Sequence, residues 1–298
     1  MNIKNIKQRA DQLLVESKPQ LCRIFLIILL IGLLRTLFSS FEGAIGSIIS
    51  LVILYAFLTL DHGYIVSTLK VVRNNSQALK DDDAWVGFSR YKDLFFTYFL
   101  QGLVFAIILI PVMIVISLVI VIFFGGFIGN ITIPLTSAAF SDASLYTQLY
   151  SILYYAPQFL ILALFIVIVV FIVAEILMLY LFPVPYLLEQ YHFKGGRAIS
   201  ESFSFMKGHV WDLFKLNFSF FGWILLSLII QVVISQLLVF IPVLGDLIAV
   251  AASGLFMVYV YYPRWKLSQT IFFEEIAYYR YDQRVNQMAN EQGATYEQ

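Results

Sequence analysis

The sequence has few charged residues and almost no cysteine. Only 13% of its 298 residues are charged and 60% are hydrophobic, whereas a soluble domain carries about 25% charged residues. No soluble fold of this length could bury so much apolar surface, so we expect lipid to surround the chain. The single cysteine, Cys22, excludes an internal disulfide framework. The net charge of zero provides no basic field, so we expect no nucleic-acid partner.

The motifs of common catalytic and metal sites are missing from the sequence. There is no phosphate-binding loop, no G-x-S-x-G and no H-E-x-x-H. The histidines His62, His192 and His209 are far apart, and none has a second ligand at metal-binding spacing. We therefore expect no metal, no cofactor and no enzymatic reaction. An intramembrane enzyme is the least favoured of the alternatives.

Long apolar runs predict six transmembrane helices. A membrane-spanning helix needs about 20 mostly apolar residues. Runs of this kind occupy residues 21–38, 44–60, 94–124, 153–182, 213–241 and 245–262. We therefore expect an all-α polytopic membrane helix bundle that forms a single domain over residues 1–285, followed by a disordered tail at 286–298. Pro111 lies inside the third run and predicts a kink there.

The basic residues indicate the orientation of these spans. There are 19 Lys and Arg residues, and all except Arg35 lie in the two terminal segments or around the second and fourth connections between runs. The other three connections, including the long one at 125–152, have none. Because cytoplasmic loops carry an excess of Lys and Arg, we expect both termini in the cytoplasm.

Three amphipathic segments, residues 3–14, 76–92 and 198–211, predict helices that lie on the cytoplasmic face of the membrane. In the first segment, Ile6 and Ala10 belong to an apolar stripe, with basic residues off the stripe. Such a helix lies on the lipid bilayer and attracts anionic lipid headgroups.

The third amphipathic segment predicts a turn as well as a helix. Met206 lies on one apolar face together with Ile199 and Phe203. Gly208 weakens the helix and predicts a turn, after which the chain enters the next span. We expect Met206, His209 and Trp211, together with Trp85 of the second segment, to act as membrane-interface anchors.

The most informative polar residue is Glu175, which interrupts an otherwise apolar run. An ionisable group within a span is costly, so Glu175 is a candidate ligand or transport site. Gln101 and Asn217 are expected at similar depth, and we predict that the three form a polar cluster in the inner half of the bundle. Two alternatives are a hydrogen-bonded glutamate that joins helices and a solvent-facing vestibule.

Residues 204–214 read SFMKGHVWDLF, and residues 219–223 read SFFGW. These strings are similar to the M-K-G-H-x-W-x-L-F…S-F-x-G-W pattern of a bacterial integral-membrane family, domain of unknown function number nine hundred and seventy-five. The resemblance implies a six-helix protein of the bacterial cytoplasmic membrane. It supplies no established activity and no catalytic residues.

The sequence therefore favours a membrane scaffold or binding protein of the bacterial envelope. Its partners would be the lipid bilayer and either a protein in the membrane or an external peptide. The alternative function is a permease for a lipid-like or amphipathic solute, which would use the polar cluster around Glu175.

Overall fold

The computed structural model describes residues 2–38, 43–74, 79–130, 161, 164–241 and 243–282. Regular structure in this part of the chain is helical and includes no strand, so the prediction of an all-α fold is confirmed. The predicted tail at 286–298 and most of the predicted connection at 125–152 lie outside the described residues.

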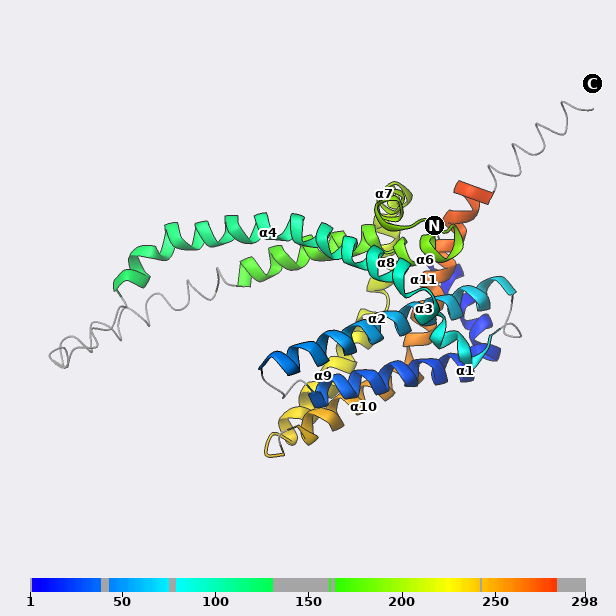
Figure 1. Ribbon diagram of the computed structural model, residues 1–298, viewed down its shortest axis with the longest axis horizontal. Coiled ribbons are helices and arrows are strands. Elements are labelled where there is room, and N and C mark those ends of the chain that lie inside the picture. Colours follow the sequence, from blue (N-terminus) through cyan, green and yellow to red (C-terminus); the bar gives the residue numbers. More distant parts are fainter. Residues whose placement is uncertain are drawn as a thin grey trace, which may run out of the picture. The chain divides into compact units, whose positions relative to one another are not determined.

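The helices fall into two compact units, one of residues 1–98 and 181–298 and the other of residues 99–180. The first helices, labelled in Figure 1, are α1 (Ile3–Phe38), α2 (Gly43–Asn74), α3 (Val86–Ser89) and α4 (Tyr91–Asn130). The 3₁₀ turn η2 (Asp81–Trp85) precedes α3. A helix over residues 164–181 follows. The remaining elements are α6 (Val184–Gln190), α7 (Gly195–Met206), α8 (Val210–Phe218), α9 (Phe221–Leu237), α10 (Leu244–Val260), α11 (Tyr262–Ala277) and the π-helical turn η3 (Tyr278–Asp282).

Within the described residues, between four and six segments have the length and composition of membrane spans. Four helices qualify alone: Ile3–Phe38, Gly46–Arg73, Tyr91–Val119 and Leu164–Gln190. The pair α8 and α9 qualifies together, with a bend of 49°, and so does the pair α10 and α11, with a bend of 53°. The chain is therefore a polytopic helix bundle, with six spans if each bent pair crosses the membrane once. Helix α4 runs through Pro111 without interruption.

Helix α1 joins the predicted surface helix at 3–14 to the predicted span at 21–38 in one helix of 36 residues. Its apolar stripe does not face lipid, because Ile6 is 1% exposed and Ala10 is fully buried. Helix α1 contacts α11 and α8. The carboxylate of Asp11 forms an ion pair with the guanidinium of Arg264 of α11, with a nitrogen–oxygen distance of 2.6 Å. Other helices therefore cover Ile6 and Ala10, and the position of this helix on the bilayer stays a prediction.

The segment from η2 to α3 is held tightly against α2 by two glycines. A Cβ atom at Gly63 would overlap the carbonyl oxygen of Ala84, and one at Gly87 would overlap that of Thr59. Asp83 is buried in this contact, and its carboxylate forms an ion pair with the ammonium of Lys70 of α2 at 2.6 Å. The predicted surface segment at 76–92 therefore packs on protein through its middle, although Trp85 is 50% exposed.

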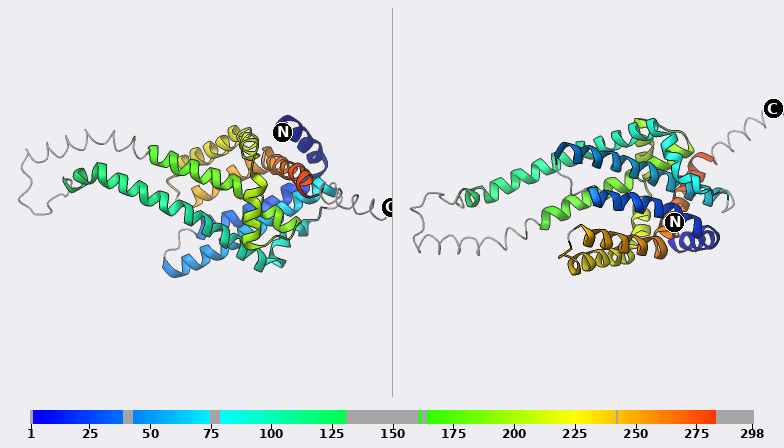
Figure 2. Two further views of the ribbon diagram at one scale, coloured as in Figure 1. Left: turned by 90° about the horizontal axis from the view of Figure 1, so that it is seen from above. Right: turned by 60° about the horizontal axis from the view of Figure 1, so that its bottom comes forward.

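The core of the first unit is rich in aromatic rings. Phe25 of α1, Tyr64 of α2 and Tyr262 of α11 form a cluster with ring centroids 4.1 to 5.8 Å apart. A second stack runs from Tyr186 to Phe273 to Phe205, with centroids 4.8 and 5.0 Å apart. These contacts join helices that are distant in the sequence. Figure 2 shows α9 and α10, in yellow and orange, as a hairpin, and α10 packs against α1.

The second unit has a different surface. In the Tyr91–Val119 segment, most of which belongs to this unit, none of the most apolar window is buried inside the protein. Large apolar side chains such as Ile107, Val115 and Phe171 are 62%, 59% and 66% exposed. A helix that presents apolar side chains on this scale is stable only when lipid or other apolar groups cover it.

Candidate functional site at the α7–α8 junction

The predicted turn at Gly208 lies between α7 and α8. The backbone N–H of His209 donates to the carbonyl oxygen of Met206 at 2.9 Å and closes the turn. Gly208 has a φ of +88°, a conformation that side-chain-bearing residues rarely adopt. The backbone N–H of Leu213 then donates to the carbonyl oxygen of His209 at 3.1 Å, which begins α8.

The buried face of α7 differs from the predicted one. Ala198, Ile199, Ser202, Phe205 and Met206 are buried, and Phe203 is only half-buried. Phe205 stacks on Phe273 of α11 with their ring centroids 5.0 Å apart. Met206 is fully buried, so its assignment as a membrane-interface anchor is wrong, because α7 packs its apolar face against protein.

A cavity of about 640 Å³ lies where this turn meets both ends of the chain. We call it the α7–α8 pocket. Its lining comes from α1 and the residue before it (Asn2, Asn5), from α7, the turn and α8 (Phe205, Lys207, His209, Asp212), and from α11 and η3 (Glu275, Ile276, Tyr279, Arg280). Cavities of roughly 300–1,000 Å³ are typical of ligand sites.

The charged groups of the pocket divide into those with protein partners and those without. Arg280 donates to the carbonyl oxygen of Ser204 at 2.9 Å and to its hydroxyl at 2.6 Å. Asp212 is 3.6 Å from the ammonium of Lys215. The side chains of Lys207, His209 and Glu275 make no hydrogen bond or ion pair with the part of the chain that the structure describes. These three are available to a ligand.

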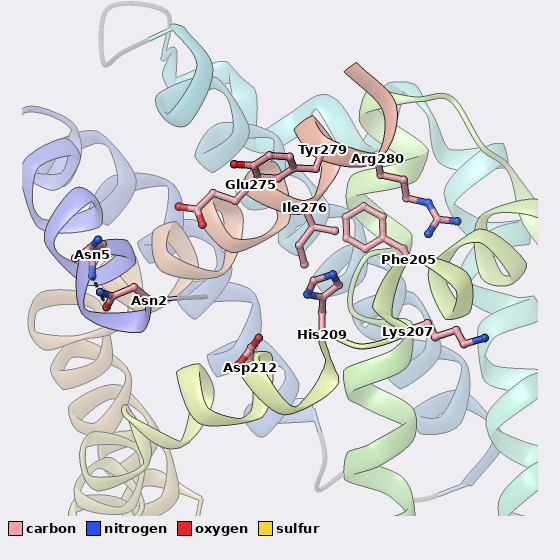
Figure 3. Close-up of a pocket in the computed structure, with 10 residues that line it drawn as sticks. All are labelled: Asn2, Asn5, Phe205, Lys207, His209, Asp212, Glu275, Ile276, Tyr279 and Arg280. Atoms are coloured by element: carbon pink, nitrogen blue, oxygen red, sulfur yellow. Dashed lines mark hydrogen bonds between the residues drawn. The ribbon is translucent and has the colours of Figure 1, made fainter. Parts of the chain in front are cut away.

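The charges are also separated within the pocket. In Figure 3, Lys207 and Arg280 lie to one side of the view, Glu275 and Asp212 lie to the other, and His209 lies between them. The buried side chains of Phe205 and Ile276 form the apolar part of the lining. The site therefore combines a basic side, an acidic side and an apolar wall.

A stripe of stacked rings begins beside the pocket. Trp211, Phe214, Phe218 and Phe221 are consecutive in this stripe, with ring centroids 5.0, 5.9 and 5.5 Å apart. We call these four residues the aromatic stripe. Trp211, Phe218 and Phe221 are 62%, 61% and 50% exposed. The exposure of Trp211 and of Trp85 is compatible with their predicted role as interface anchors, which stays a prediction.

The three residues of the predicted polar cluster have different environments. The side-chain oxygen Oδ1 of Asn217 accepts a hydrogen bond from the indole N–H of Trp265 at 3.0 Å and another from the side-chain amide of Gln269 at 2.9 Å. Gln101 and Glu175 belong to the second unit. The Gln101 side-chain oxygen is buried without a hydrogen-bond partner, and Glu175 is half-buried. The cluster as a whole stays a prediction.

One polar cluster was not predicted. The carboxylate of Glu189, on α6, accepts from Arg90 at 2.6 Å and lies 3.2 Å from Nε2 of His62 on α2. Arg90 also donates to the carbonyl oxygen of Leu188 at 3.4 Å. We call His62, Arg90 and Glu189 the Glu189 cluster. No sequence motif joins these residues, because they lie on three elements that only the fold brings together.

The Glu189 cluster has the geometry of a structural crosslink. His62 is fully buried, and its Nδ1 atom has no hydrogen-bond partner among the described residues. A carboxylate paired with Arg90 accepts hydrogen bonds, so Nε2 of His62 is the donor in this contact. The three side chains therefore tie α2 and α6 to the residue between α3 and α4.

Among the described residues, no group of three or more His, Cys, Asp or Glu side chains could hold a metal ion. The chemistry that the α7–α8 pocket offers is reversible binding through charge, hydrogen bonds and apolar contact.

The family described as "Protein of unknown function (DUF975)" matches residues 1–279 of the chain. Neither the curated proteins nor the solved structures include a match.

Proposed function

The chain belongs to the DUF975 family, and from this premise we propose that it is a membrane scaffold or binding protein of the bacterial envelope. Its ligand or partner binds at the α7–α8 pocket. The observation that carries this proposal is the set of unpaired polar groups in that pocket. Lys207, His209 and Glu275 come from two distant parts of the sequence, line one cavity, and make no side-chain hydrogen bond or ion pair with the described residues.

The proposed location is the bacterial cytoplasmic membrane, with both termini and the α7–α8 pocket on the cytoplasmic side. The support is the distribution of Lys and Arg along the sequence. Lys207 lines the pocket, and residues from both terminal segments line it too. One side of the membrane therefore holds the pocket and the basic segments together.

Thiol labelling tests this orientation. Cys22 is 5% exposed, so the native protein gives a low background. In intact cells, a membrane-impermeant maleimide is expected to label Ser137→Cys, in the predicted external connection, and not Lys207→Cys. In inside-out vesicles the pattern is expected to reverse. Labelling of Lys207→Cys in intact cells would overturn the proposed orientation.

Photo-crosslinking in living cells tests the binding function. A photoreactive residue at Tyr279, which is 68% exposed and lines the pocket, is expected to give an adduct of defined mass. The matched control is the same residue at Val15, which is 80% exposed on α1 and does not line the pocket. The Tyr279 adduct is expected to be lost with Lys207→Gln and Glu275→Gln combined. No pocket-dependent adduct would overturn the proposal.

Transport of a lipid-like or amphipathic solute is the second candidate function. It is favoured by Glu175 and Gln101, which carry polar groups in apolar helices, since the buried oxygen of Gln101 has no partner. The test is solute-dependent flux in liposomes that contain the purified protein. The permease predicts a flux that Glu175→Gln reduces. Absence of flux, or equal flux with this variant, would remove the role of Glu175.

A further inference from the structure

The charge arrangement of the α7–α8 pocket matches a zwitterion. Lys207 and Glu275 provide one positive and one negative charge without an ion-pair partner among the described residues, whereas Arg280 is paired with Glu201 and Asp212 with Lys215, each at 3.6 Å. The basic and acidic side chains lie on opposite sides of the pocket in Figure 3. A ligand with one positive and one negative charge can therefore place its negative group next to Lys207 and its positive group next to Glu275. An anion alone would also meet the field of two carboxylates, which opposes its binding.

The position of the pocket points to a membrane lipid. The α8–α9 pair is a candidate membrane span, and it begins at Val210, next to His209 of the pocket lining. The ends of membrane spans lie at the depth of the polar headgroups, so the side of the cavity at the start of α8 is open to a headgroup.

The aromatic stripe provides a path from the pocket into the apolar region. Trp211 lies between His209 and Asp212 in the sequence, and both of these neighbours line the pocket. The stripe then runs along α8 to the start of α9, which together form a candidate span. Exposed, stacked rings on a membrane-facing helix form a flat apolar surface that suits an acyl chain.

We propose that the α7–α8 pocket binds one phospholipid whose headgroup carries a primary ammonium, of the phosphatidylethanolamine class. Its phosphate lies against Lys207, its ammonium lies against Glu275, and one acyl chain follows the aromatic stripe. This inference rests on the proposed binding function and names the ligand of the same pocket.

The headgroup chemistry makes the proposal selective. A phosphatidylglycerol headgroup has no positive charge for Glu275. A phosphatidylcholine headgroup has a positive charge but no N–H to donate to a carboxylate. The loss of one hydrogen bond to a charged group lowers affinity about tenfold or more, so we expect the ammonium headgroup to bind about tenfold more tightly than either.

Native mass spectrometry of the full-length protein in detergent tests this selectivity. After removal of endogenous lipid, phosphatidylethanolamine, phosphatidylglycerol and phosphatidylcholine of equal chain length are added separately. We expect one phosphatidylethanolamine adduct per protein at the lowest concentrations. Glu275→Gln is expected to abolish the preference for phosphatidylethanolamine over phosphatidylglycerol. Lys207→Gln is expected to lower the affinity for both lipids about tenfold. The matched controls are Asp82→Asn and Lys18→Gln, exposed sites outside the pocket lining.

Two further comparisons identify the source of the headgroup. Trp211→Ala is expected to weaken phosphatidylethanolamine binding and to leave competition by soluble phosphoethanolamine unchanged. Phosphoethanolamine that binds as tightly as the lipid would overturn the lipid assignment. Equal adducts from all three lipids, or pocket variants that behave like the controls, would overturn it too. If photo-crosslinking at Tyr279 then captured a protein or peptide, the binding function would stand without the lipid.

Discussion

The Glu189 cluster and the α7–α8 pocket each contain a histidine, a cation and a carboxylate, but their environments differ. In the cluster, Glu189 is shared by Arg90 and by His62, which is fully buried. In the pocket, Lys207, His209 and Glu275 line an open cavity and make no side-chain hydrogen bond or ion pair with the described residues around them. The same residue types therefore give a crosslink in one region and a binding surface in the other.

This difference teaches how to separate structural from functional polar groups in a membrane protein. A buried ion pair that loses one partner leaves an uncompensated charge, so its residues depend on each other. A polar group that lines a water-accessible cavity forms its hydrogen bonds with water, so it can exchange those waters for a ligand. Three substitutions test this separation, in order of their expected effect on the free energy of unfolding.

The largest effect is expected for Glu189→Ala. Removal of this carboxylate leaves Arg90 without its ion pair and His62 without a hydrogen bond on either nitrogen. We expect a loss of about 3 kcal/mol in the free energy of unfolding, the lower end for a broken buried pair. Thermal unfolding in detergent measures the loss, with Asp82→Asn at an exposed site as control. Equal melting of the two variants would remove the distinction between cluster and pocket.

An intermediate effect is expected for Gly63→Ala, which acts on the backbone next to His62. The added methyl group would overlap the carbonyl oxygen of Ala84, so η2 must move away from α2. Overpacking of this kind costs about 2 kcal/mol, and it would open the sealed region without touching the pocket.

Gly102→Ala is the matched control for that substitution. Gly102 lies in a helix with no atom near the position of a new Cβ, and alanine is the better helix former. We expect unchanged or slightly raised stability. If Gly63→Ala melted at the same temperature as Gly102→Ala, the close contact between α2 and η2 would be refuted.

Sequence patterns predicted the helices but not what covers them. The long apolar runs indicated an all-α bundle, and Gly208 indicated the turn that now positions Lys207 and His209. Amphipathic spacing also identified Ile6 and Met206 as apolar-face residues. It assigned those faces to lipid, whereas both side chains are buried in protein. The spacing of apolar residues indicates that one face of a helix is shielded from water. Whether lipid or protein shields it depends on contacts between distant segments of the chain.

The pocket was only partly predictable for the same reason. His209 was singled out by its place near a turn, and the resemblance to a family centred on the same stretch. Glu275 and Asn5 could not be predicted, because they reach the pocket from opposite ends of the chain. The Glu189 cluster was missed entirely, since His62, Arg90 and Glu189 share no local pattern.

The smallest effect on stability is expected for His209→Gln. This side chain makes no hydrogen bond with the described residues, so its replacement is expected to change the free energy of unfolding by less than about 0.5 kcal/mol. The matched substitution His62→Gln removes a fully buried ring and is expected to be clearly destabilising.

Chemical modification compares the two histidines within one protein. Diethyl pyrocarbonate reacts with accessible neutral imidazole, so peptide mass spectrometry is expected to find His209 modified in the folded protein. His62, which is fully buried, is expected to react only after denaturation. Because His209 lies between the two charged sides of the pocket, added phosphatidylethanolamine is expected to slow its modification. Rapid modification of His62 in the folded protein would break the comparison, since it would show that the Glu189 cluster is as open as the pocket.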